Sequence, residues 1–535
     1  KLPIIRILTD NGKINEKGGK YAGLKIHQAR EAIIEDLTQE GLIEKEEKIS
    51  HEVGVCDRCK THIEILEVKQ WFMKTRALTE DVIKTANEIV WYPDYMKTRL
   101  IDWAKSLDWD WVISRQRVFA TPIPVWYCKD CNQTIVANEK WVPIDPKLTD
   151  PPIEKCPKCG GKKFVGERDV FDTWMDSSIT CAVHAGWPDR IDWKRFYPAS
   201  VHPSGIDIIR TWAYYLMVRH LALFEETPFK SCLINGMVLG SNGRKMSKSL
   251  KNYVAAPKVL LKYGSDATRQ WAAAGGTTGS DIPFRWPDVE YGRRFLVKLW
   301  NVSGFVNKLL ESYEPNKKFV GELQPLDKWI LSKVAKLTDK VTTAMNNCQF
   351  NVAIEEIRNF TWHTLCDSYV EAVKDRLYRP EIHGDSQKTA AQYTLYTVLY
   401  KILKFLSPIT PHVTEEIYQA MFFDFKKHKS LSITPWPTSI PHLIDEEIEN
   451  NGDIIIALIT EVRREKSEKR LPLNSPITTM TIYANDNKTA KIFQDGATDI
   501  SGTCKVENLK IINETGNGRK ISDYPTVKFK TQFQS

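Results

Sequence analysis

CLINGMVLGSNGRKMSKSLKN, residues 232–252, passes from a short apolar segment into a loop rich in glycine, serine and lysine. The apolar residues 232–240 are typical of a buried strand, and Gly240 and Gly243 predict a turn after it. Three lysines follow the turn: Lys245, Lys248 and Lys251. Ligands of open α/β sheets bind at the carboxyl ends of strands, so this loop is placed to close over a polyphosphate. A solvated basic loop is the alternative interpretation of the same residues.

The bulk composition predicts a folded chain with several domains. It has 535 residues, of which 42% are hydrophobic, 10% aromatic and 27% charged, with a net charge of +8. A chain of this length exceeds one compact core and should form roughly three or four domains. The longest apolar runs, such as IIIALI at 454–459, are far shorter than the roughly 20 residues of a membrane-spanning helix, so no membrane partner is expected. The charge permits a polyanionic partner but does not require one.

Six of the 11 cysteines form Cys-x-x-Cys pairs: Cys56/Cys59, Cys128/Cys131 and Cys156/Cys159. The second and third pairs lie close together in sequence, and CPKCGG supplies a tight turn. Their spacing predicts one tetrahedral zinc site in a reducing, cytoplasmic compartment. The first pair has no second half downstream, so either it binds no metal or its partner cysteines precede Lys1.

The first half of the chain has a mixed α/β pattern. Residues 1–67 combine short strands with an amphipathic helix, HQAREAIIEDLTQEG, for which Gly41 predicts the end. From 68 to 255, strand-like runs such as WVISRQRVFATPIPVWY alternate with helical ones such as DIIRTWAYYLMVRHLALF. This alternation predicts part of a parallel sheet with crossover helices.

The second half is helical and then mixed again. Three apolar stripes at helical spacing predict a bundle up to about residue 425: Leu326, Ile330, Val334, Leu337 and Val341; Trp362, Cys366, Tyr369, Val373 and Leu377; Leu395, Leu399, Ile402 and Leu406. The last 90 or so residues predict a basic helix, ALITEVRREKSEKR, followed by β-segments in a small α/β unit.

KMSKS, residues 245–249, is identical to the signature loop of the class I aminoacyl-tRNA synthetases. The stretches WVISRQRVFATPIPVWYC, DVFDTWMDSS, GIDIIRTWAYY and GSDIPFRWPDVEYGRRFLVKLWN resemble the valyl, isoleucyl and leucyl branch, and most closely the valyl-tRNA synthetases of archaeal type. The resemblance covers nearly the whole chain. It implies an incomplete α/β Rossmann-type catalytic domain with a zinc-ribbon insertion, then an all-α anticodon-binding bundle and a small C-terminal α/β unit.

The resemblance implies five domains. Residues 1–67 are the tail of an editing insertion, and residues 68–255 are the second half of the catalytic domain, with a zinc ribbon at 126–165. A connecting helical region at 256–320, the bundle at 321–445 and the last unit at 446–535 follow. The family's His-x-Gly-His motif and editing residues are expected upstream of Lys1.

The activity implied is a two-step ligation in which valine reacts with ATP and Mg²⁺ to give valyl-adenylate, and the valyl group passes to tRNA(Val). Editing of threonine and a monomeric state are expected with it. Two alternatives stay open: an isoleucyl-tRNA synthetase, and a zinc-bearing tRNA-binding protein without catalytic activity.

The resemblance also implies roles for individual residues. Lys245 and Lys248 act at the phosphates. The ATP site takes Gly205, Asp207, Met246, Ser247, Lys248 and Ser249, with Ile206 where the family has histidine. Trp174, Asp176 and Trp212 belong to the amino-acid pocket. For Arg463, Arg464, Lys466, Lys469 and Arg470, tRNA contact and a solvated helix face are equally compatible with the interleaved glutamates.

Overall fold

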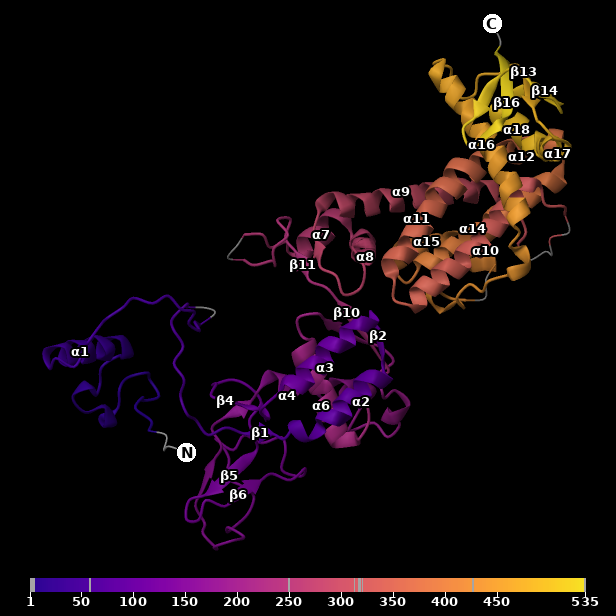
Figure 1. The fold of residues 1–535 in the computed structure, drawn as a ribbon. Helices are drawn as coiled ribbons and strands as arrows, with labels where there is room; N and C mark the ends of the chain where they lie inside the picture. The colour runs from indigo at the N-terminus through magenta and orange to yellow at the C-terminus, as the bar shows by residue number, and fades with distance from the viewer. Residues whose placement is uncertain are drawn as a thin grey trace. The chain divides into compact units, whose positions relative to one another are not determined.

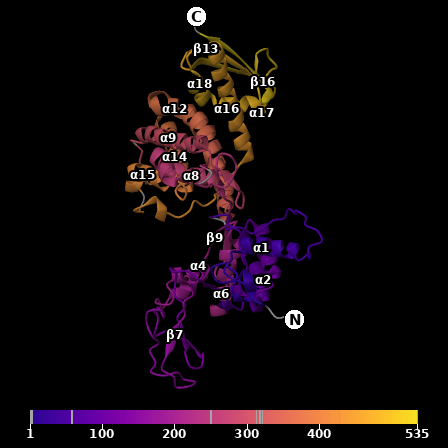
Figure 2. The same cartoon turned by 90° about the vertical axis from the view of Figure 1, so that its left-hand side faces the viewer.

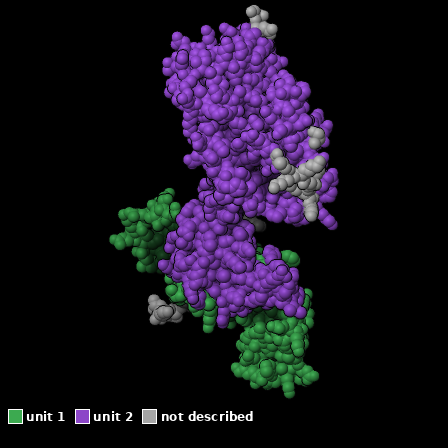
Figure 3. Space-filling view, turned by 90° about the vertical axis from the view of Figure 1, so that its right-hand side faces the viewer, with its two compact units in different colours: residues 1–80, 106–180 green, residues 81–105, 181–535 purple. Residues whose placement is uncertain are grey.

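The computed structural model describes residues 5–56, 59–248, 251–311, 313–315, 319, 321–425 and 428–533. The chain divides into two compact units, coloured separately in Figure 3. Unit 1 comprises residues 1–80 and 106–180, and unit 2 comprises residues 81–105 and 181–535. Within the described residues, no helix has both the length and the apolar character that crossing a membrane requires.

Unit 1 begins with helix α1 (Ile26–Gln39), which ends as predicted. Gly41 has a φ of 68°, and the N–H of Leu42 donates to the carbonyl of Leu37, which closes the last turn. The remaining strands of this unit are short and antiparallel: β1 (Phe72–Met73) with β3 (Trp111–Val112), β4 (Ser114–Arg115) with β8 (Val170–Phe171), and β5 (Val125–Cys128) between β6 (Thr134–Val136) and β7 (Phe164–Gly166).

The prediction that residues 111–127 supply a strand of the parallel sheet was wrong. The segment divides into β3, β4 and β5, all antiparallel. Pro122 and Pro124 interrupt it and offer no N–H to a strand ladder, so one continuous central strand is excluded.

Unit 2 contains the predicted parallel sheet (Figure 1), in the order β2 (Val90–Tyr92), β10 (Ser231–Asn235), β9 (His202–Gly205). The crossover from β9 to β10 runs through a π-helical segment, Ile209–Ala213, and helix α6 (Tyr214–Phe224). Helices α2 (Thr79–Glu88) and α3 (Lys97–Ser106) flank β2 in sequence. The sheet is buried through residues such as Cys232 and Ile234, which are fully inaccessible.

A second parallel pair follows, β11 (Val238–Leu239) with β12 (Ile282–Pro283). Between these strands lie α7 (Ala256–Tyr263) and α8 (Ser265–Ala274), and α9 (Trp286–Leu309) comes next. Buried residues of this region form a small core: Val259, Ala267, Phe284 and Val289.

The bundle consists of α10 (Pro325–Asn346), α11 (Phe350–Asn359), a π-helical segment η6 (Phe360–Val370), α12 (Glu371–Tyr378), α13 (Pro380–His383), α14 (Asp385–Leu406) and α15 (Pro411–Met421). The three predicted stripes all contribute to one core, in which every stripe residue is buried except Trp362, which is partly buried. Because burial follows the helical repeat of apolar residues, the periodicity alone located these helices.

The last unit is the predicted small α/β fold (Figure 2). It contains α16 (Glu446–Glu468), β13 (Ile477–Tyr483), α17 (Asn487–Asp495), α18 (Ala497–Cys504), β14 (Val506–Ile512), β15 (Arg519–Ile521) and β16 (Tyr524–Phe533). Its sheet has the order β14–β13–β16–β15, with β14 parallel to β13 and the other pairs antiparallel.

Lys466 takes neither of the two roles considered for the basic residues of α16. It is only 1% exposed, and its ammonium donates to the carbonyls of Leu473, Ser475 and Cys504. A buried ammonium is tolerated because all three of its donors are satisfied. Lys466 therefore joins the end of α16 to the strands that follow and does not face a ligand.

Candidate functional site

The carboxyl end of β9 forms a tight turn that presents Asp207. The N–H of Ile206 donates to the carbonyl of Asn235 on the neighbouring strand (2.9 Å), and the N–H of Ile208 donates to Gly205 (3.1 Å). A Cβ atom at position 205 would lie 2.9 Å from the Asp207 carboxylate, closer than real contacts allow. Gly205 therefore leaves room for the Asp207 carboxylate in the position that it occupies here, and the turn forms with Ile206 in the family's histidine position.

The lysine loop, residues 240–252, leaves β11 and folds back on itself. Leu239 forms an isolated bridge with Lys245, and the N–H of Gly240 donates to the carbonyl of Arg244 (2.8 Å). The Asn252 side chain closes the loop, because it accepts from the N–H of Ser247 (2.8 Å) and donates to the carbonyl of Lys245 (3.2 Å). The backbone of the loop is thus organised by its own polar groups.

Met246 anchors the lysine loop to the protein. Its side chain is partly buried against the small core that contains Val259 and Phe284. Neighbouring Lys245 and Lys248 are exposed. An apolar side chain directed inward therefore leaves the two ammonium groups available to solvent and ligands.

Lys245 connects the lysine loop to the turn after β9. Its Nζ lies 3.6 Å from the Asp207 carboxylate, and the two side chains are 71% and 45% exposed. An ion pair this exposed contributes little stability. Lys248 forms no ion pair with any described residue, and Ser249 lies outside the described residues. The arrangement brings the Asp207 carboxylate and the Lys245 ammonium together at one end of the parallel sheet.

Trp174 and Asp176 lie in unit 1, on the short helix α4 (Thr173–Ser177), where Trp174 is partly buried and Asp176 is exposed. Asp172 caps this helix by accepting from the N–H of Trp174 (3.1 Å), and it also pairs with Arg115. The Asp172 carboxylate is thereby fixed from two sides, and it fixes the start of the helix that carries Trp174.

Trp212 lies in unit 2, on the π-helical segment after the Asp207 turn. It meets His202 of β9 edge to face, with ring centroids 4.6 Å apart, and His202 stacks on Phe229 at 4.7 Å. Burial lowers the pKa of His202 to about 4, and burial likewise lowers the pKa of His220 on α6 to about 4. Both imidazoles are therefore neutral at pH 7, and they support the aromatic side of the helix by packing.

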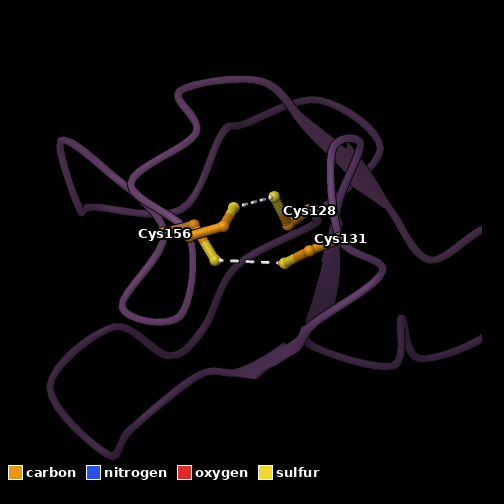
Figure 4. Close-up of side chains that lie close together, drawn as sticks. Cys128, Cys131 and Cys156 are labelled. Atoms are coloured by element: carbon orange, nitrogen blue, oxygen red, sulfur yellow. Dashed lines mark hydrogen bonds between the residues drawn. The ribbon is translucent and has the colours of Figure 1, made fainter.

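Four cysteines form the predicted metal centre (Figure 4), and their sulfur atoms all lie within 4.8 Å of one another. The Sγ–Sγ distances are 3.6 Å for Cys128–Cys159 and 3.7 Å for Cys131–Cys156. Tetrahedral zinc with bonds of about 2.3 Å places its sulfur ligands about 3.8 Å apart, so the donor set fits zinc.

The turn from Cys156 to Gly161 affects its two thiols differently. Although the N–H of Gly161 stabilises the thiolate of Cys159, hydrogen bonding with Cys131 and burial raise the pKa of that thiol to about 12. The N–H groups of Lys158 and Gly161 point at the sulfur atoms of Cys156 and Cys159. Although burial opposes ionisation of Cys156, backbone N–H groups stabilise its thiolate and lower its pKa to about 7. A thiolate is the form that zinc binds.

The pair Cys56/Cys59 shares two backbone hydrogen bonds with the cysteine turns of the metal centre. The N–H of Cys56 donates to the carbonyl of Thr61, and the N–H of Lys60 donates to the carbonyl of Cys56. In the same way, the N–H of Cys128 donates to the carbonyl of Gln133, and the N–H of Asn132 donates to the carbonyl of Cys128. Hydrogen bonds with Thr61 lower the pKa of Cys59 to about 7. Within the described part of the chain, no further His, Cys, Asp or Glu completes a metal site around this pair.

A cleft of about 700 Å³ lies in the helical part of unit 2, between α9 and the η6–α12 segment. It is lined by charged, amide and apolar side chains, among them Arg293, Lys298, Asn301, Phe305, Asp367 and Lys374. Lys298 pairs with Asp367 (2.7 Å) and lies 4.3 Å above the Trp362 ring. The cleft therefore combines an amide and an aromatic ring with cations, most of which are paired with carboxylates of the same cleft: Lys298 with Asp367, Lys374 with Glu371 and Arg294 with Glu290. Cations, amides and aromatic rings can contact unstacked nucleic-acid bases and their phosphates.

Sequence reasoning missed several residues that organise these sites. Asn252 ends the lysine-rich stretch, and its loop-closing side chain is a common role for asparagine. Asp172 stands directly before a helix, which is an N-cap signal. His202 and the bundle cleft have no local signal, because both depend on contacts between segments distant in sequence.

Comparison with known proteins gives consistent results. Residues 12–285 match the family model described as tRNA synthetases class I (I, L, M and V), and residues 327–481 match the anticodon-binding domain of tRNA ligase. Proteins named valine–tRNA ligase from Methanothermobacter thermautotrophicus and Methanopyrus kandleri are 45% and 43% identical over 96% and 95% of the chain. These alignments cover 56% and 55% of the two relatives, so the chain spans little more than half their length.

Two solved structures are similar as well. A ternary complex of LeuRS, tRNA and LeuAMS from Agrobacterium radiobacter has a TM-score of 0.51 at 25% identity, covering 63% of this chain and 44% of that one. Methionyl-tRNA synthetase from Mycobacterium tuberculosis, in complex with methionyl-adenylate, has a TM-score of 0.50 at 18% identity, covering 74% of this chain and 73% of that one.

Proposed function

The chain belongs to the class I tRNA synthetases of the isoleucine, leucine, methionine and valine group, and we propose that it contributes the lysine-loop half of an active site that joins valine to tRNA(Val). The choice of valine is supported by relatives named valine–tRNA ligase, which are 41–45% identical to this chain. The chemistry is ATP-dependent. A carboxylate oxygen of valine bonds to the α-phosphorus of ATP while the bond from that phosphorus to the α–β bridging oxygen breaks, releasing pyrophosphate. A ribose hydroxyl of the 3'-terminal adenosine of tRNA then bonds through its oxygen to the valyl carbonyl carbon and loses its proton, while the bond from that carbon to the phosphate oxygen breaks and AMP leaves.

The observation that carries this proposal is the approach of Lys245 to Asp207 at the end of the parallel sheet, 3.6 Å apart. ATP enters as its Mg²⁺ complex. Its phosphates replace the carboxylate as the partner of Lys245 and also engage Lys248, which neutralises charge on the departing pyrophosphate. Asp207 is then free to accept hydrogen bonds from ribose hydroxyls or from the substrate ammonium group.

We assign the remaining loop residues to support of the same site. Met246 holds the loop against its core, and the backbone at Ser247 is fixed by Asn252. Ser249 is assigned to the phosphates by its place in the motif alone. Since no covalent enzyme intermediate is required, positioning and electrostatic stabilisation account for the rate.

Trp174, Asp176 and Trp212 are assigned to valine selection by their places in the family's motifs alone. Rigid indole walls exclude larger side chains, but a pocket for valine rejects its isostere threonine only about a hundredfold. A separate editing step for threonine follows from that limit, and residues 1–67 are assigned to the tail of the editing insertion.

The cleft between α9 and the η6–α12 segment is assigned to the anticodon loop. Proteins recognise RNA sequence chiefly in single-stranded loops, through stacking and through hydrogen bonds to base edges. Asn301 supplies an amide for base edges, and Arg293, which is exposed and forms no ion pair with a described residue, supplies charge for the adjoining phosphates.

The structural role proposed for zinc is to hold the ribbon of β5, β6 and β7. Cys128, Cys131, Cys156 and Cys159 would bind it, and a closed site with four thiolate ligands stabilises a fold without taking part in catalysis. Cys56 and Cys59 would bind a second zinc only together with two further ligands.

The test is amino-acid-dependent exchange of pyrophosphate into ATP, catalysed by the product of the complete coding frame. Valine should give the highest exchange rate, with isoleucine at least tenfold lower. Higher exchange with isoleucine would make the protein an isoleucyl-tRNA synthetase. Binding of tRNA without exchange for any amino acid would favour the catalytically inactive tRNA-binding alternative.

A further inference from the structure

The sheet of the C-terminal unit has two faces of different character. Side chains alternate between the faces of a strand, and Met480, Ile482 and Phe529 are fully buried on the inner face. Helices α16, α17 and α18 contact the sheet from this side. The outer face presents Thr479 and Thr481 of β13, together with their partners on the flanking strands, whereas the Tyr483 ring lies against Gly516 of the segment between β14 and β15.

Lysines are concentrated on this outer face. Thr481 of β13 has Lys510 of β14 as its partner on one side and Lys530 of β16 on the other. Along β16, the next outward residue is Lys528, which is directly opposite Lys520 of β15. Lys510, Lys520 and Lys530 are exposed. With strands about 4.8 Å apart, the four lysines lie within reach of one ligand.

The polar neighbours on the face complete its hydrogen-bonding character. Thr479 has Asn508 as its partner on β14 and Gln532 as its partner on β16. Between Thr479 and Tyr483, the outward positions of the four described strands hold no aspartate or glutamate. The face is therefore cationic and polar without internal neutralisation.

Most other cations of the unit have carboxylate partners, which makes the outer face unusual. Ion pairs are formed by Arg464 with Glu461, Lys469 with Glu465, Lys488 with Glu447, Lys491 with Asp495, Lys505 with Asp375 and Arg519 with Glu468. Lys510, Lys520 and Lys530 form no ion pair with any described residue. Lys528 instead donates to the carbonyl of Gly516 (3.1 Å).

The pairing of Lys520 with Lys528 has an energetic cost. Like charges directly opposite one another on neighbouring strands are destabilising, and this face offers no anion to offset them. A phosphate bound above the pair would remove that repulsion. Cross-strand lysines at this site therefore favour an anionic partner over a purely structural role.

We propose that this outer sheet face, defined by Lys510, Lys520, Lys528 and Lys530 with Thr479 and Thr481, binds the phosphate backbone of tRNA. The inference rests on the proposed function, which supplies a polyanion as substrate. Lysine, threonine, asparagine and glutamine are residues that contact phosphate and sugar, and such contacts position an RNA without reading its sequence. The face thus adds affinity and orientation, while the cleft near α9 recognises bases.

The experiment measures binding of a tRNA(Val) transcript to the whole chain by fluorescence anisotropy at several salt concentrations. The test variant carries Lys510→Gln, Lys520→Gln and Lys530→Gln. Each lost phosphate contact lowers the slope of log affinity against log salt by about 0.7–0.9. The triple variant should therefore lose about 2 from that slope and bind tRNA about 10 to 100 times more weakly at 0.15 M salt.

A matched control removes the same charge elsewhere in unit 2: Lys340→Gln, Lys488→Gln and Lys491→Gln, three exposed lysines that are already paired with Glu356, Glu447 and Asp495. Its affinity should change less than about threefold. A second test variant, Thr481→Glu, keeps every lysine but places a carboxylate between Lys510 and Lys530, and it should weaken binding about tenfold.

The outcomes separate this inference from the proposed function. If the triple test variant still binds tRNA as tightly as the unaltered chain, or if the triple control variant loses as much affinity as the test variant, the outer face is not the phosphate site. Either result leaves the synthetase assignment intact. An unaltered chain that binds no tRNA overturns the proposed function, and the inference with it. If the triple test variant binds heparin more weakly than the unaltered chain but binds tRNA with unchanged affinity, the outer face is a non-specific cationic surface, and the inference is also overturned.

Discussion

Lys245 and Lys248 differ in their electrostatic surroundings although they are only three residues apart. Lys245 lies 3.6 Å from a carboxylate, whereas Lys248 is exposed and forms no ion pair with a described residue. A free ammonium can approach phosphates without first breaking a contact. Lys248 is therefore the stronger candidate for stabilising charge that develops on pyrophosphate.

Replacing Lys248 with alanine should slow adenylate formation about 10²- to 10³-fold, comparable to loss of one oxyanion donor. Affinity for tRNA should stay within about twofold, because the loop contacts ATP. Pre-steady-state adenylate formation by the complete enzyme is the measurement. Lys251→Asn serves as the control, since it removes a charge from the same loop and asparagine tolerates the φ of 53° at this position. Equal rates for Lys248→Ala and the unaltered enzyme would refute the role.

Two buried histidines make the stability of unit 2 depend on pH. The pKa of His202 and of His220 is about 4 in the folded protein, because of burial, against 6.5 for exposed histidine. The unfolded chain therefore takes up protons below about pH 6.5, whereas the folded chain does so only near pH 4. Their contribution is complete above pH 6.5 and is lost as the pH falls toward 4, about 2 kcal/mol per histidine between pH 7.5 and 5.

The variant His202→Phe should reduce this pH dependence by about half, because phenylalanine can still stack on Phe229 but cannot be protonated. The free energy of unfolding by urea at pH 7.5 and pH 5 is the measurement. His184→Gln, at an exposed position, should leave the difference between the two pH values unchanged. A His202→Phe variant with the same pH dependence as the unaltered chain would show that His202 does not titrate as described.

The sequence located residues whose chemistry is local and missed those whose partners are distant. Both cysteine pairs of the metal centre and the turn at Gly205 follow from short patterns. The structure brings the four cysteines of the two pairs together, and separately it forms a tight turn at Gly205. Asn252 belongs to the lysine-rich stretch of the sequence. Its side-chain hydrogen bonds to Ser247, Asn242, Arg244 and Lys245 form only because the loop folds back on itself. His202 contacts Phe229, far along the chain, so no local pattern identifies it.

At the scale of elements, the three-stranded sheet of β5, β6 and β7 is small, and its strands have three or four residues each, too few to fold independently. The loops on either side meet at Cys128, Cys131, Cys156 and Cys159 and through a backbone hydrogen bond from Lys129 to Lys163. One zinc held by the four thiolates would stabilise this sheet, since metal binding to a structural site is coupled to folding.

The chain should contain one tightly bound zinc, and Cys156→Ser should lose it together with protection of the β5 amides from hydrogen exchange. Metal analysis and hydrogen exchange are the measurements. Cys56→Ser is the matched control and should leave the zinc content at one per chain. A content of two, falling to one in Cys56→Ser, would show that the first pair completes a site within this chain.

Element prediction succeeded where hydrophobic periodicity is decisive. The stripes of α10 and α14 repeat at helical spacing, and all their predicted members are buried. It failed for residues 111–127, because an apolar run of alternating character does not specify which strand it will pair with. The partner of a strand is a segment distant in sequence, such as β8 for β4, and the residues of the strand itself do not identify that partner.

At the scale of the whole molecule, α12 links two parts of unit 2. One side of this helix contributes Glu371 and Lys374 to the cleft near α9. The other side contributes Arg376, which is fully buried and binds Asp327 of α10 and Asp499 of α18. The C-terminal α/β fold is joined to the bundle by a shared hydrophobic core, to which this guanidinium and its two carboxylates add a buried polar contact. The outer sheet face therefore keeps a defined relation to the cleft.

Replacing Arg376 with leucine should destabilise the chain by about 3–5 kcal/mol at pH 8, because two buried carboxylates lose the cation that they share. The loss should be smaller at pH 5. Burial raises the pKa of Asp499 to about 6 even with Arg376 present, so without the cation Asp499 is protonated more readily as the pH falls, which lowers the cost of burying it. Urea unfolding at the two pH values measures this difference.

The control variant Arg379→Leu removes a half-exposed arginine one turn away, paired with Asp375, and should cost less than about 1 kcal/mol at either pH. Equal losses for the two variants, or a loss at Arg376 that does not change between pH 8 and pH 5, would mean that the buried charges do not hold the C-terminal fold to the bundle.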